Sequence, residues 1–502
     1  MSVPVLFRDV RLPERDAGEG TTLSVNPLVE NRRIAAFGAP PARQGRIVEG
    51  RGDLPMPGPI DGHGRAFVNP MEGRRVCLPL ALFKLGESPV FKRVRPTQGQ
   101  AYLRTMLGCI ATLRHGATAG MAVCPFLPEP TEEIRDAVAQ ACVDSGMRVA
   151  LAREEPELSK LEKRPFLDDP EPAEIGEKLA RQPGLRGADP LALYDHLIAR
   201  WHGAGDGRIG AAFVCSAPLR VAPGSFATLD ALSRAHDLSL VAHGLETKRK
   251  RVFGHARMGG RSMVKNARDL GPLSDRKRVV HANRVGADDL EPVATAGANV
   301  AHNPTNDPRR GSGAGPLREL PDRGISRALG AGETFAGDRL NIWSVTKAAA
   351  LAPTRAGVAR RFRPSARDGH RAGTRGGGCA KRRPGWGSME LGAPADLTLV
   401  DLSPRACPPI NDLARQLAHV ENNSAVRSTL AAGCAVAKNG RVTAVDKAAL
   451  PAKAREVFAA LAPVPRGAAN AISAPLPANL AMHKRAVAGD IGRTNTFRQG
   501  LF

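Results

Sequence analysis

The segment from Met56 to Arg65 reads Met-Pro-Gly-Pro-Ile-Asp-Gly-His-Gly-Arg and places a histidine near the end of a short strand. Successive side chains of a strand point to opposite faces, so Asp61, His63 and Arg65 share one face. A neutral imidazole offers a lone pair to a metal ion, whereas a guanidinium carries a fixed positive charge and no lone pair. The segment therefore combines one candidate metal ligand with a cation that opposes a metal.

Strand and helix patterns alternate along the chain after this segment. A helical pattern with an N-terminal cap covers 131–146 and precedes an apolar strand at 148–152. Further helical patterns cover 190–201 and 225–236, and the second leads into a strand that ends at His243. This alternation is what an α/β fold of the (β/α)8 TIM-barrel type requires. His243 would then lie at the C-terminal end of a strand, where barrel enzymes keep their chemistry.

Five motifs follow one another between residues 56 and 345, and their order is informative. They are Pro57-Gly58 with Asp61 and His63; His243-Gly244-Leu245-Glu246-Thr247; Val279-Val280-His281-Ala282; Ala301-His302-Asn303-Pro304 with Gly311-Ser312-Gly313; and Ala328-Leu329-Gly330-Ala331-Gly332-Glu333. In this order the chain resembles the amidohydrolase superfamily, and within it the branch of nucleobase deaminases and triazine chlorohydrolases.

The resemblance implies a role for each matching residue. His63 and His243 correspond to metal ligands, and Glu246 corresponds to the general acid/base. His281 corresponds to the histidine that orients the attacking water, and His302 to a residue that contacts substrate or supports the ligands. Each has a simpler alternative: His63 could be an inherited core residue, and His243 with Glu246 could form a buried hydrogen-bonded pair.

Two family ligand positions are substituted in this chain. Arg65 stands where the family has its second histidine, and Gly332 stands where it has a metal-binding, base-acting aspartate. His63 and His243 alone make a two-ligand site, whereas zinc sites normally have at least three protein ligands. Glu333 and Asp338 are candidate replacements, but the pleat should turn Glu333 to the opposite face of its strand.

The resemblance also implies the domain organisation and the chemistry. It predicts a small, discontinuous β-sandwich made by both chain ends (1–55 and 387–450), a barrel over 56–386 and a C-terminal helix and tail over 451–502. The implied activity is metal-dependent hydrolysis of carbon–nitrogen bonds other than peptide bonds, with deamination of a cyclic amidine or nucleobase-like small molecule as the expected reaction. Zinc is the expected cofactor, with iron as an alternative. A catalytically impaired relative that binds a ligand or partner, with Arg65 supplying the charge of the metal, is the alternative function.

The formal net charge of +23 and the pI near 10.5 raise the question of nucleic-acid binding. Much of the excess lies in Lys248–Arg251 and in an atypical basic segment at 353–386 that shows no apolar periodicity. We interpret the first as a solvated loop, and the second as either a stretch read out of frame or a disordered basic insertion. Nucleic acid is therefore not an expected partner.

Cysteine spacing and hydropathy favour an ordinary intracellular enzyme. The eight cysteines include no Cys-x-x-Cys pair, so reduced and buried thiols are expected. No apolar run long enough to span a membrane occurs, and the N-terminus lacks the pattern of a signal peptide. The sequence thus predicts a cytoplasmic protein with a small-molecule substrate and no membrane contact, and it leaves open whether the chain is a homo-oligomer.

Overall fold

The structure is a computed structural model of the chain. It describes residues 3–13, 22–38, 45–65, 68, 72, 79–80, 82, 96–124, 131–153, 158, 176–177, 180, 190–334, 339–351, 365–379, 385–403, 406, 409–445, 449–461, 473 and 475–489. Asp338, a candidate ligand in the sequence, lies outside the described residues.

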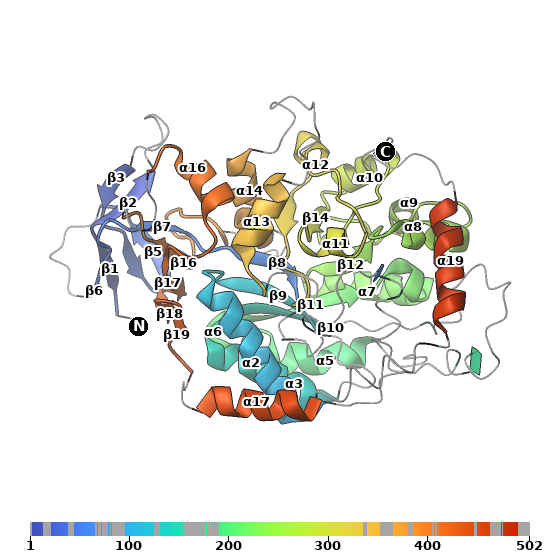
Figure 1. Ribbon diagram of the computed structural model, residues 1–502, viewed down its shortest axis with the longest axis horizontal. Helices are drawn as coiled ribbons and strands as arrows, with labels where there is room; N and C mark the ends of the chain where they lie inside the picture. Colours follow the sequence, from blue (N-terminus) through green and yellow to red (C-terminus); the bar gives the residue numbers. More distant parts are fainter. Residues whose placement is uncertain are drawn as a thin grey trace.

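Parallel strands form a closed barrel at the centre of the molecule (Figure 1). Their order in the sheet is β15-β14-β13-β12-β11-β10-β9-β8. The barrel closes where β8 meets β15: Arg65 N donates to Gly332 O at 3.0 Å, and Gly332 N donates to His63 O at 3.0 Å. The predicted TIM barrel is thus confirmed. The strands are β8 Ile60–Gly64, β9 Ala119–Cys124, β10 Arg148–Arg153, β11 Ile209–Cys215, β12 Leu240–Gly244, β13 Lys277–His281, β14 Asn299–His302 and β15 Arg327–Leu329.

Helices cover the barrel, and apolar side chains fill its interior. The predicted helix after residue 131 is α3, and Thr131 Oγ1 accepts a hydrogen bond from Ile134 N to cap it. The interior cluster comprises Met121, Val123, Ala152, Ala212, Val214, Val241, Val280, Ala301 and Ala328. The covering helices are α2 Gln98–Arg114, α3 Glu132–Ser145, α5 Pro190–Trp201, α7 Pro223–Ala235, α8 Lys248–Arg257, α9 Met263–Asp269, α10 Ala287–Thr295 and α13 Ile342–Leu351, with the short α6 Ala204–Gly207, α11 Asn306–Arg309 and α12 Glu319–Asp322.

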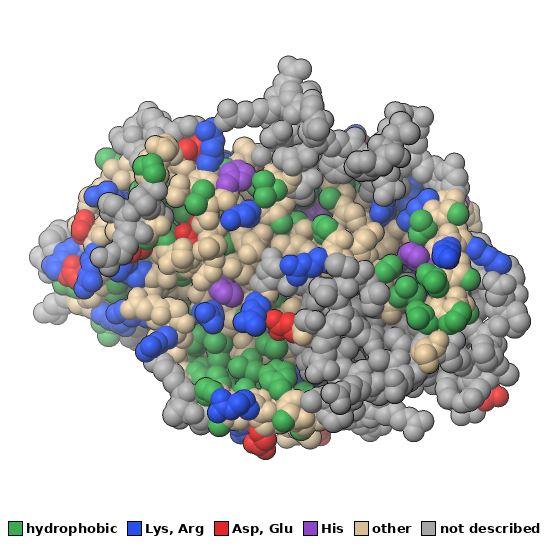
Figure 2. Space-filling model, in the orientation of Figure 1, with side chains coloured by type: hydrophobic (Ala, Val, Ile, Leu, Met, Phe, Trp, Pro, Cys, Tyr) green, Lys and Arg blue, Asp and Glu red, His purple; other side chains and the backbone are tan. Residues whose placement is uncertain are grey.

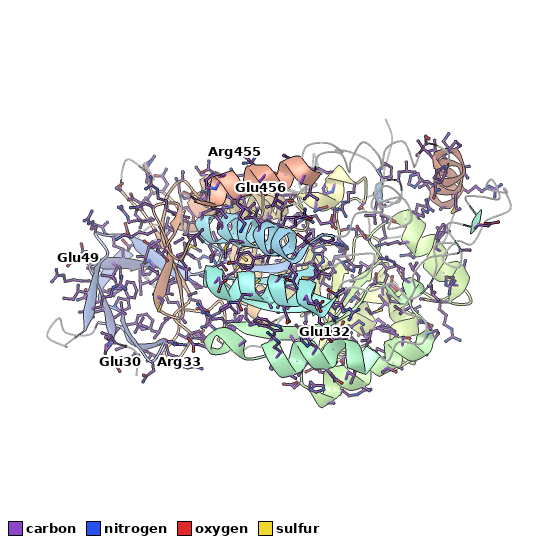
Figure 3. All side chains as sticks on the ribbon, turned by 90° about the horizontal axis from the view of Figure 1, so that it is seen from below. Glu30, Arg33, Glu49, Glu132, Arg455 and Glu456 are labelled. Atoms are coloured by element: carbon purple, nitrogen blue, oxygen red, sulfur yellow. The ribbon has the colours of Figure 1, made fainter. Side chains whose placement is uncertain are left out.

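Two sheets built from both chain ends pack beside the barrel. One has the order β5-β4-β1-β6, and the other has the order β19-β18-β17-β16-β7. Apolar side chains of both sheets share one core cluster that includes Phe7, Ile34 and Leu397. Figure 3 shows these sheets at one end of the molecule, with Glu30 and Glu49 on the outer side. The strands of these two sheets are β1 Val5–Arg8, β4 Leu28–Glu30, β5 Arg33–Ala36, β6 Arg46–Glu49, β7 Leu54–Pro57, β16 Leu397–Val400, β17 Val426–Ala431, β18 Cys434–Lys438 and β19 Arg441–Val442. A separate antiparallel pair consists of β2 Val10–Pro13 and β3 Thr22–Val25.

The expectation of an unstructured basic segment at 353–386 is wrong for its central part. Residues 366–373 form α14 (Ala366–Gly373), and α15 (Arg375–Cys379) follows directly. Ser365 Oγ accepts from Asp368 N at 3.1 Å, and the Asp368 carboxylate accepts from Ser365 N at 3.0 Å. This reciprocal cap starts α14 despite a sequence poor in apolar residues. Residues 352–364 and 380–384 lie outside the described part of the chain.

The glycines of this segment allow close packing rather than preventing a helix. A Cβ on Gly376 would lie 1.7 Å from Arg327 O, and one on Gly377 would lie 2.7 Å from Ile60 Cβ. Only residues without a side chain can approach β15 and β8 so closely. The three consecutive glycines therefore let α15 lie directly against the seam at which the barrel closes.

The basic run Lys248–Arg251 is also not the solvated loop that the sequence suggested. It forms the first turn of α8, and Arg249 is buried. Lys248 and Arg249 donate hydrogen bonds to carbonyl oxygens of α19 (Leu476–Ala488), which packs on α8 through Met482; α17 (Ala449–Leu461) is the other C-terminal helix. The charged ends of these two long side chains thus bind α19 to α8. Within the described residues, no helix is both long and apolar enough to cross a membrane.

Candidate active site

Three histidines meet at the C-terminal ends of the barrel strands. His63 lies on β8, His243 lies on β12, and His281 ends β13. The ring centroid of His63 is 5.1 Å from that of His243 and 5.6 Å from that of His281, and the last two are 5.6 Å apart. All three side chains are buried. Motifs that are far apart in the sequence therefore converge at the end of the barrel where such enzymes react.

Hydrogen bonds set the tautomers of two of these imidazoles. His243 Nδ1 lies 2.7 Å from Ser216 O, which can only accept, so Nδ1 carries the proton and Nε2 keeps its lone pair. His63 Nε2 donates to that nitrogen at 3.2 Å, and His63 Nδ1 accepts from Asn303 Nδ2 at 3.1 Å. Burial and the neighbouring His243 and His281 lower the pKa of His63 well below its usual value. His63 is therefore neutral, and both imidazoles are hydrogen-bonded through both ring nitrogens.

Glu246, three residues after His243, is buried among positive groups. Its Oε2 pairs with Lys250 Nζ in the first turn of α8 and lies 3.6 Å from His281 Nε2, while its Oε1 lies 3.7 Å from Arg310 Nη1. Burial alone raises the pKa of a carboxyl group, but the charges of His281, Lys250 and Arg310 outweigh it and hold the pKa of Glu246 well below the usual range. Glu246 is therefore an ionised hydrogen-bond acceptor at neutral pH.

Arg65 forms a buried ion pair with Glu333. Arg65 Nε lies 2.7 Å from Glu333 Oε1, and Arg310 Nη2 lies 3.0 Å from Glu333 Oε2. All three side chains are buried: Arg65 is 7% exposed, and Glu333 and Arg310 are each 6% exposed. Because Arg310 also reaches Glu246, the charges alternate in sign along a continuous chain of four side chains. We call the set Arg65, Glu333, Arg310 and Glu246 the ion-pair bridge.

The expectation that the pleat turns Glu333 away from the site is wrong. The strand β15 ends at Leu329, and Gly332 adopts a φ of +70°. This left-handed conformation, which glycine adopts readily, ends the alternation of an extended strand. Glu333 therefore reaches the side chain of Arg65, although both of its oxygens are engaged by guanidinium groups.

His281 is held from behind by an aspartate that the sequence motifs did not indicate. Its Nδ1 lies 2.9 Å from Asp307 Oδ1, and Asp307 Oδ2 accepts from Asn283 Nδ2 at 2.8 Å. His281 has a φ of +75°, an uncommon conformation for a residue other than glycine. The Asp307 carboxylate accepts the Nδ1 proton, and the other ring nitrogen, Nε2, lies 3.6 Å from Glu246 Oε2.

His302 lies at the end of β14 but takes no part in the cluster of three imidazoles. Its side chain is buried, and burial lowers its pKa to about 3. A Cβ on Gly315 would lie 2.3 Å from His302 Cε1, so the imidazole packs directly on a glycine backbone. Its contact with a substrate remains a prediction.

The donors of this site do not fit the four-ligand metal centre that the resemblance implies. The Nε2 atoms of His63 and His243 are 3.2 Å apart, close to the ~3.4 Å expected for two nitrogens on one tetrahedral zinc ion. Two donors are therefore well placed. The third position holds the cation Arg65, however, and Gly332 offers no side chain at the fourth. Among the described residues, a group of three potential donors within 4.8 Å of one another comprises Glu246, His281 and Asp307, and it contains neither of these histidines.

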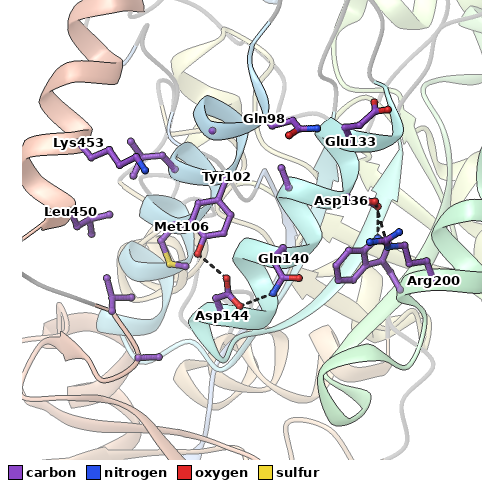
Figure 4. A pocket seen from close by; sticks show the side chains of 16 residues that line it. Gln98, Tyr102, Met106, Glu133, Asp136, Gln140, Asp144, Arg200, Leu450 and Lys453 are labelled. Carbon is purple, nitrogen blue, oxygen red and sulfur yellow. Dashed lines mark hydrogen bonds and ion pairs between the residues drawn. The ribbon is translucent and has the colours of Figure 1, made fainter.

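A cavity lies on the outside of the barrel, away from these residues. It has a volume of about 610 Å³ and is lined by α2, α3, α5 and α17. Figure 4 shows Tyr102 and Gln140 directed at Asp144, with Asp136 beside Arg200. Figure 2 shows hydrophobic side chains gathered on the surface where Figure 1 places α2 and α17. The acidic side chains that line the cavity already have partners, and none of the residues at the barrel end lines it.

Comparison with known proteins agrees with this fold. The model of the amidohydrolase family matches residues 55–436, which include all the barrel strands and the histidines and glutamate at their C-terminal ends. The chain belongs to the amidohydrolase family. It is 29% identical over 446 residues to a 5-methylthioadenosine/S-adenosylhomocysteine deaminase of Nitratidesulfovibrio vulgaris, covering 88% of this chain and 90% of the relative.

Solved structures resemble the chain over nearly its full length. An atrazine chlorohydrolase from Arthrobacter aurescens in complex with zinc has a TM-score of 0.76 and 22% identity, and the match covers 90% of this chain and all of that one. An adenosine deaminase from Xanthomonas campestris with bound zinc has a TM-score of 0.72 and 22% identity, covering 91% and 98%. The predicted family, fold and hydrolase class are confirmed, and zinc is present in these two neighbours.

Sequence reasoning missed three residues of the site. Asp307 and Arg310 lie between the two parts of the fourth motif, where the local pattern does not indicate that their side chains turn toward the barrel. Lys250 could have been found, because it lies four residues after Glu246 at the start of a helix, the spacing of a helical ion pair.

Proposed function

We propose that the chain binds an aminated heterocycle of the adenosine type at the C-terminal end of the barrel and hydrolyses its exocyclic carbon–nitrogen bond, releasing ammonia. The observation that carries the proposal is the convergence of His63, His243, His281 and Glu246 at one buried place. The deaminase names of relatives matched over most of the chain support the substrate class. The substrate itself, a cytoplasmic location and any homo-oligomer remain predictions.

Glu246 and His281 would act on protons. The ionised carboxylate of Glu246 would accept a hydrogen bond from the amino group or from a ring N–H of the ligand, and could take a proton from an attacking water. His281 donates its Nδ1 proton in a hydrogen bond to Asp307, and its Nε2 points toward Glu246. His63, as a neutral imidazole, and His243 would line the site.

A metal ion in the related enzymes would activate the water, but the donors of this chain do not fit one. General acid–base catalysis contributes about 10²–10⁴-fold, far less than the roughly 10⁶-fold or more by which enzymes accelerate reactions. We therefore expect slow turnover in this chain.

Binding without turnover is the second candidate function, and the ion-pair bridge favours it. Arg65 and Arg310 bring fixed positive charge to the region of the absent ligands without activating water. Such a site can still recognise a heterocycle through Glu246.

One set of assays tests both functions. Calorimetric titration with adenosine, 5′-deoxyadenosine, adenine, cytosine and a triazine measures binding, and ammonia release measures hydrolysis. We expect binding of at least one compound and its loss in Glu246→Gln, whereas Glu132→Gln on the outer helix α3 should bind normally. Binding together with ammonia release that Glu246→Gln abolishes supports the deaminase, and binding alone supports the second candidate. Absence of binding to every compound contradicts both.

A further inference from the structure

We infer that the ion-pair bridge has replaced the divalent ion, so that the chain folds and keeps its site without metal and does not take one up at this position. The two substitutions that the sequence shows separately, at Arg65 and Gly332, are then parts of one change. This inference concerns how the site is built and does not depend on which ligand it binds.

The bridge lies where the barrel closes. Backbone hydrogen bonds join β8 to the segment after β15 through Arg65 and Gly332, and the Arg65–Glu333 pair joins the side chains of the same two segments. A metal bound by ligands from these two positions would connect the same segments. The ion pair therefore makes the connection that such a metal would make.

The charges of the bridge compensate one another. Arg65 and Arg310 each carry one positive charge, and Glu333 and Glu246 each carry one negative charge. Burying a charge costs much less free energy when an opposite charge lies beside it, as in each contact of the bridge. A divalent ion placed beside Arg65 would meet a fixed positive charge that is already committed to Glu333.

The space of the missing carboxylate is also occupied. A Cβ on Gly332 would lie 2.2 Å from Asn306 Nδ2 and 2.9 Å from Asn306 Cγ. The amide of Asn306 thus stands where a side chain at position 332 would begin. Gly332, Asn306 and the bridge therefore fit together in one arrangement. That arrangement leaves no space for the aspartate that the family has at position 332.

Metal content and chelator sensitivity test the inference in the unmodified full chain. The protein is incubated with excess zinc and desalted, and the zinc that it retains is compared with that retained by His63→Ala. We expect the difference between the two to be far less than one zinc ion per chain. We also expect the melting temperature to be unchanged by a strong chelator or by added zinc, because an ion that binds the folded state would raise it. One retained zinc per chain that His63→Ala removes, or a melting temperature that falls with chelator, overturns the inference.

A double-mutant cycle tests the bridge itself. Glu333→Gln leaves two buried guanidinium groups without their shared carboxylate, and we expect the melting temperature to fall by roughly 5 °C. Arg65→Met with Glu333→Gln should lower it by clearly less than the sum of the two single changes. Asp322→Asn, which breaks the exposed pair with Arg318, is the control and should have almost no effect. Additive effects, or a Glu333→Gln variant as stable as the control, contradict the inference.

Discussion

Replacing Gly332 by alanine should destabilise the protein for two separable reasons. Gly332 has a φ of +70°, in the left-handed region that residues with a Cβ rarely adopt. The new Cβ would also lie 2.2 Å from Asn306 Nδ2, and the Asn306 side chain is buried and cannot swing into solvent. Either the backbone or the buried amide must move.

The two contributions have known sizes. A left-handed conformation costs an L-residue about 1–2 kcal/mol, and overpacking in a filled interior costs about 1–3 kcal/mol. The free energy of unfolding of Gly332→Ala should therefore fall by roughly 2–5 kcal/mol. Gly324 separates the contributions: its φ is +72°, and a Cβ there would meet no atom within 4 Å. Gly324→Ala should lose only the conformational part.

Urea denaturation followed by circular dichroism measures both variants against the unmodified chain. The refuting result is a Gly332→Ala variant that loses no more stability than Gly324→Ala, because the contact with Asn306 would then be without consequence. A second refuting result is a Gly332→Ala variant as stable as the unmodified chain.

The same geometry limits the restoration of a metal site. Arg65→His with Gly332→Asp supplies both family ligands, yet the aspartate would still collide with Asn306. We expect zinc binding only when Asn306→Gly is added, measured as zinc retained after desalting. One retained zinc in the double variant would show that Asn306 moves aside at little cost.

Three further predictions follow from other parts of the molecule. Burial raises the pKa of Asp53 from 3.8 to about 6, so the stabilisation of the folded state by its protonated carboxyl is fully present below pH 3.8 and is lost as the pH rises through 6. Asp53→Asn should therefore flatten the pH dependence of the free energy of unfolding between these values. An unchanged profile would contradict this. Gly376→Ala would place a Cβ 1.7 Å from Arg327 O and should cost about 3 kcal/mol or more, so a variant with an unchanged melting temperature would show that α15 does not pack so closely. Lys250→Met removes a cation beside Glu246 and should raise the pKa of that carboxyl, visible as a shift in the pH dependence of ligand binding, while Lys265→Met on α9 should produce none.

Much of the fold was predictable because barrel strands and helices have local signatures. The capped helix after Thr131 and the strand before His243 were both read correctly from spacing. Asn-Gly is a typical sequence for a two-residue hairpin turn, and Asn439 and Gly440 both adopt the positive φ that such a turn requires. The central part of the basic segment, residues 365–379, was misread because its glycines suit close packing against Ile60, and that contact has no local signature.

The sequence by itself determined the family and the set of candidate site residues. The spacing of His63 and Arg65 on one strand, and of His243 and Glu246 at the end of another, is fixed by local geometry. Only the tertiary structure decided what the substitutions do. Arg65 meets Glu333 because the barrel closes between β8 and β15, and Gly332 breaks the pleat so that the carboxylate can turn inward. Ion pairs between residues far apart in the chain depend on that closure, which no local pattern encodes.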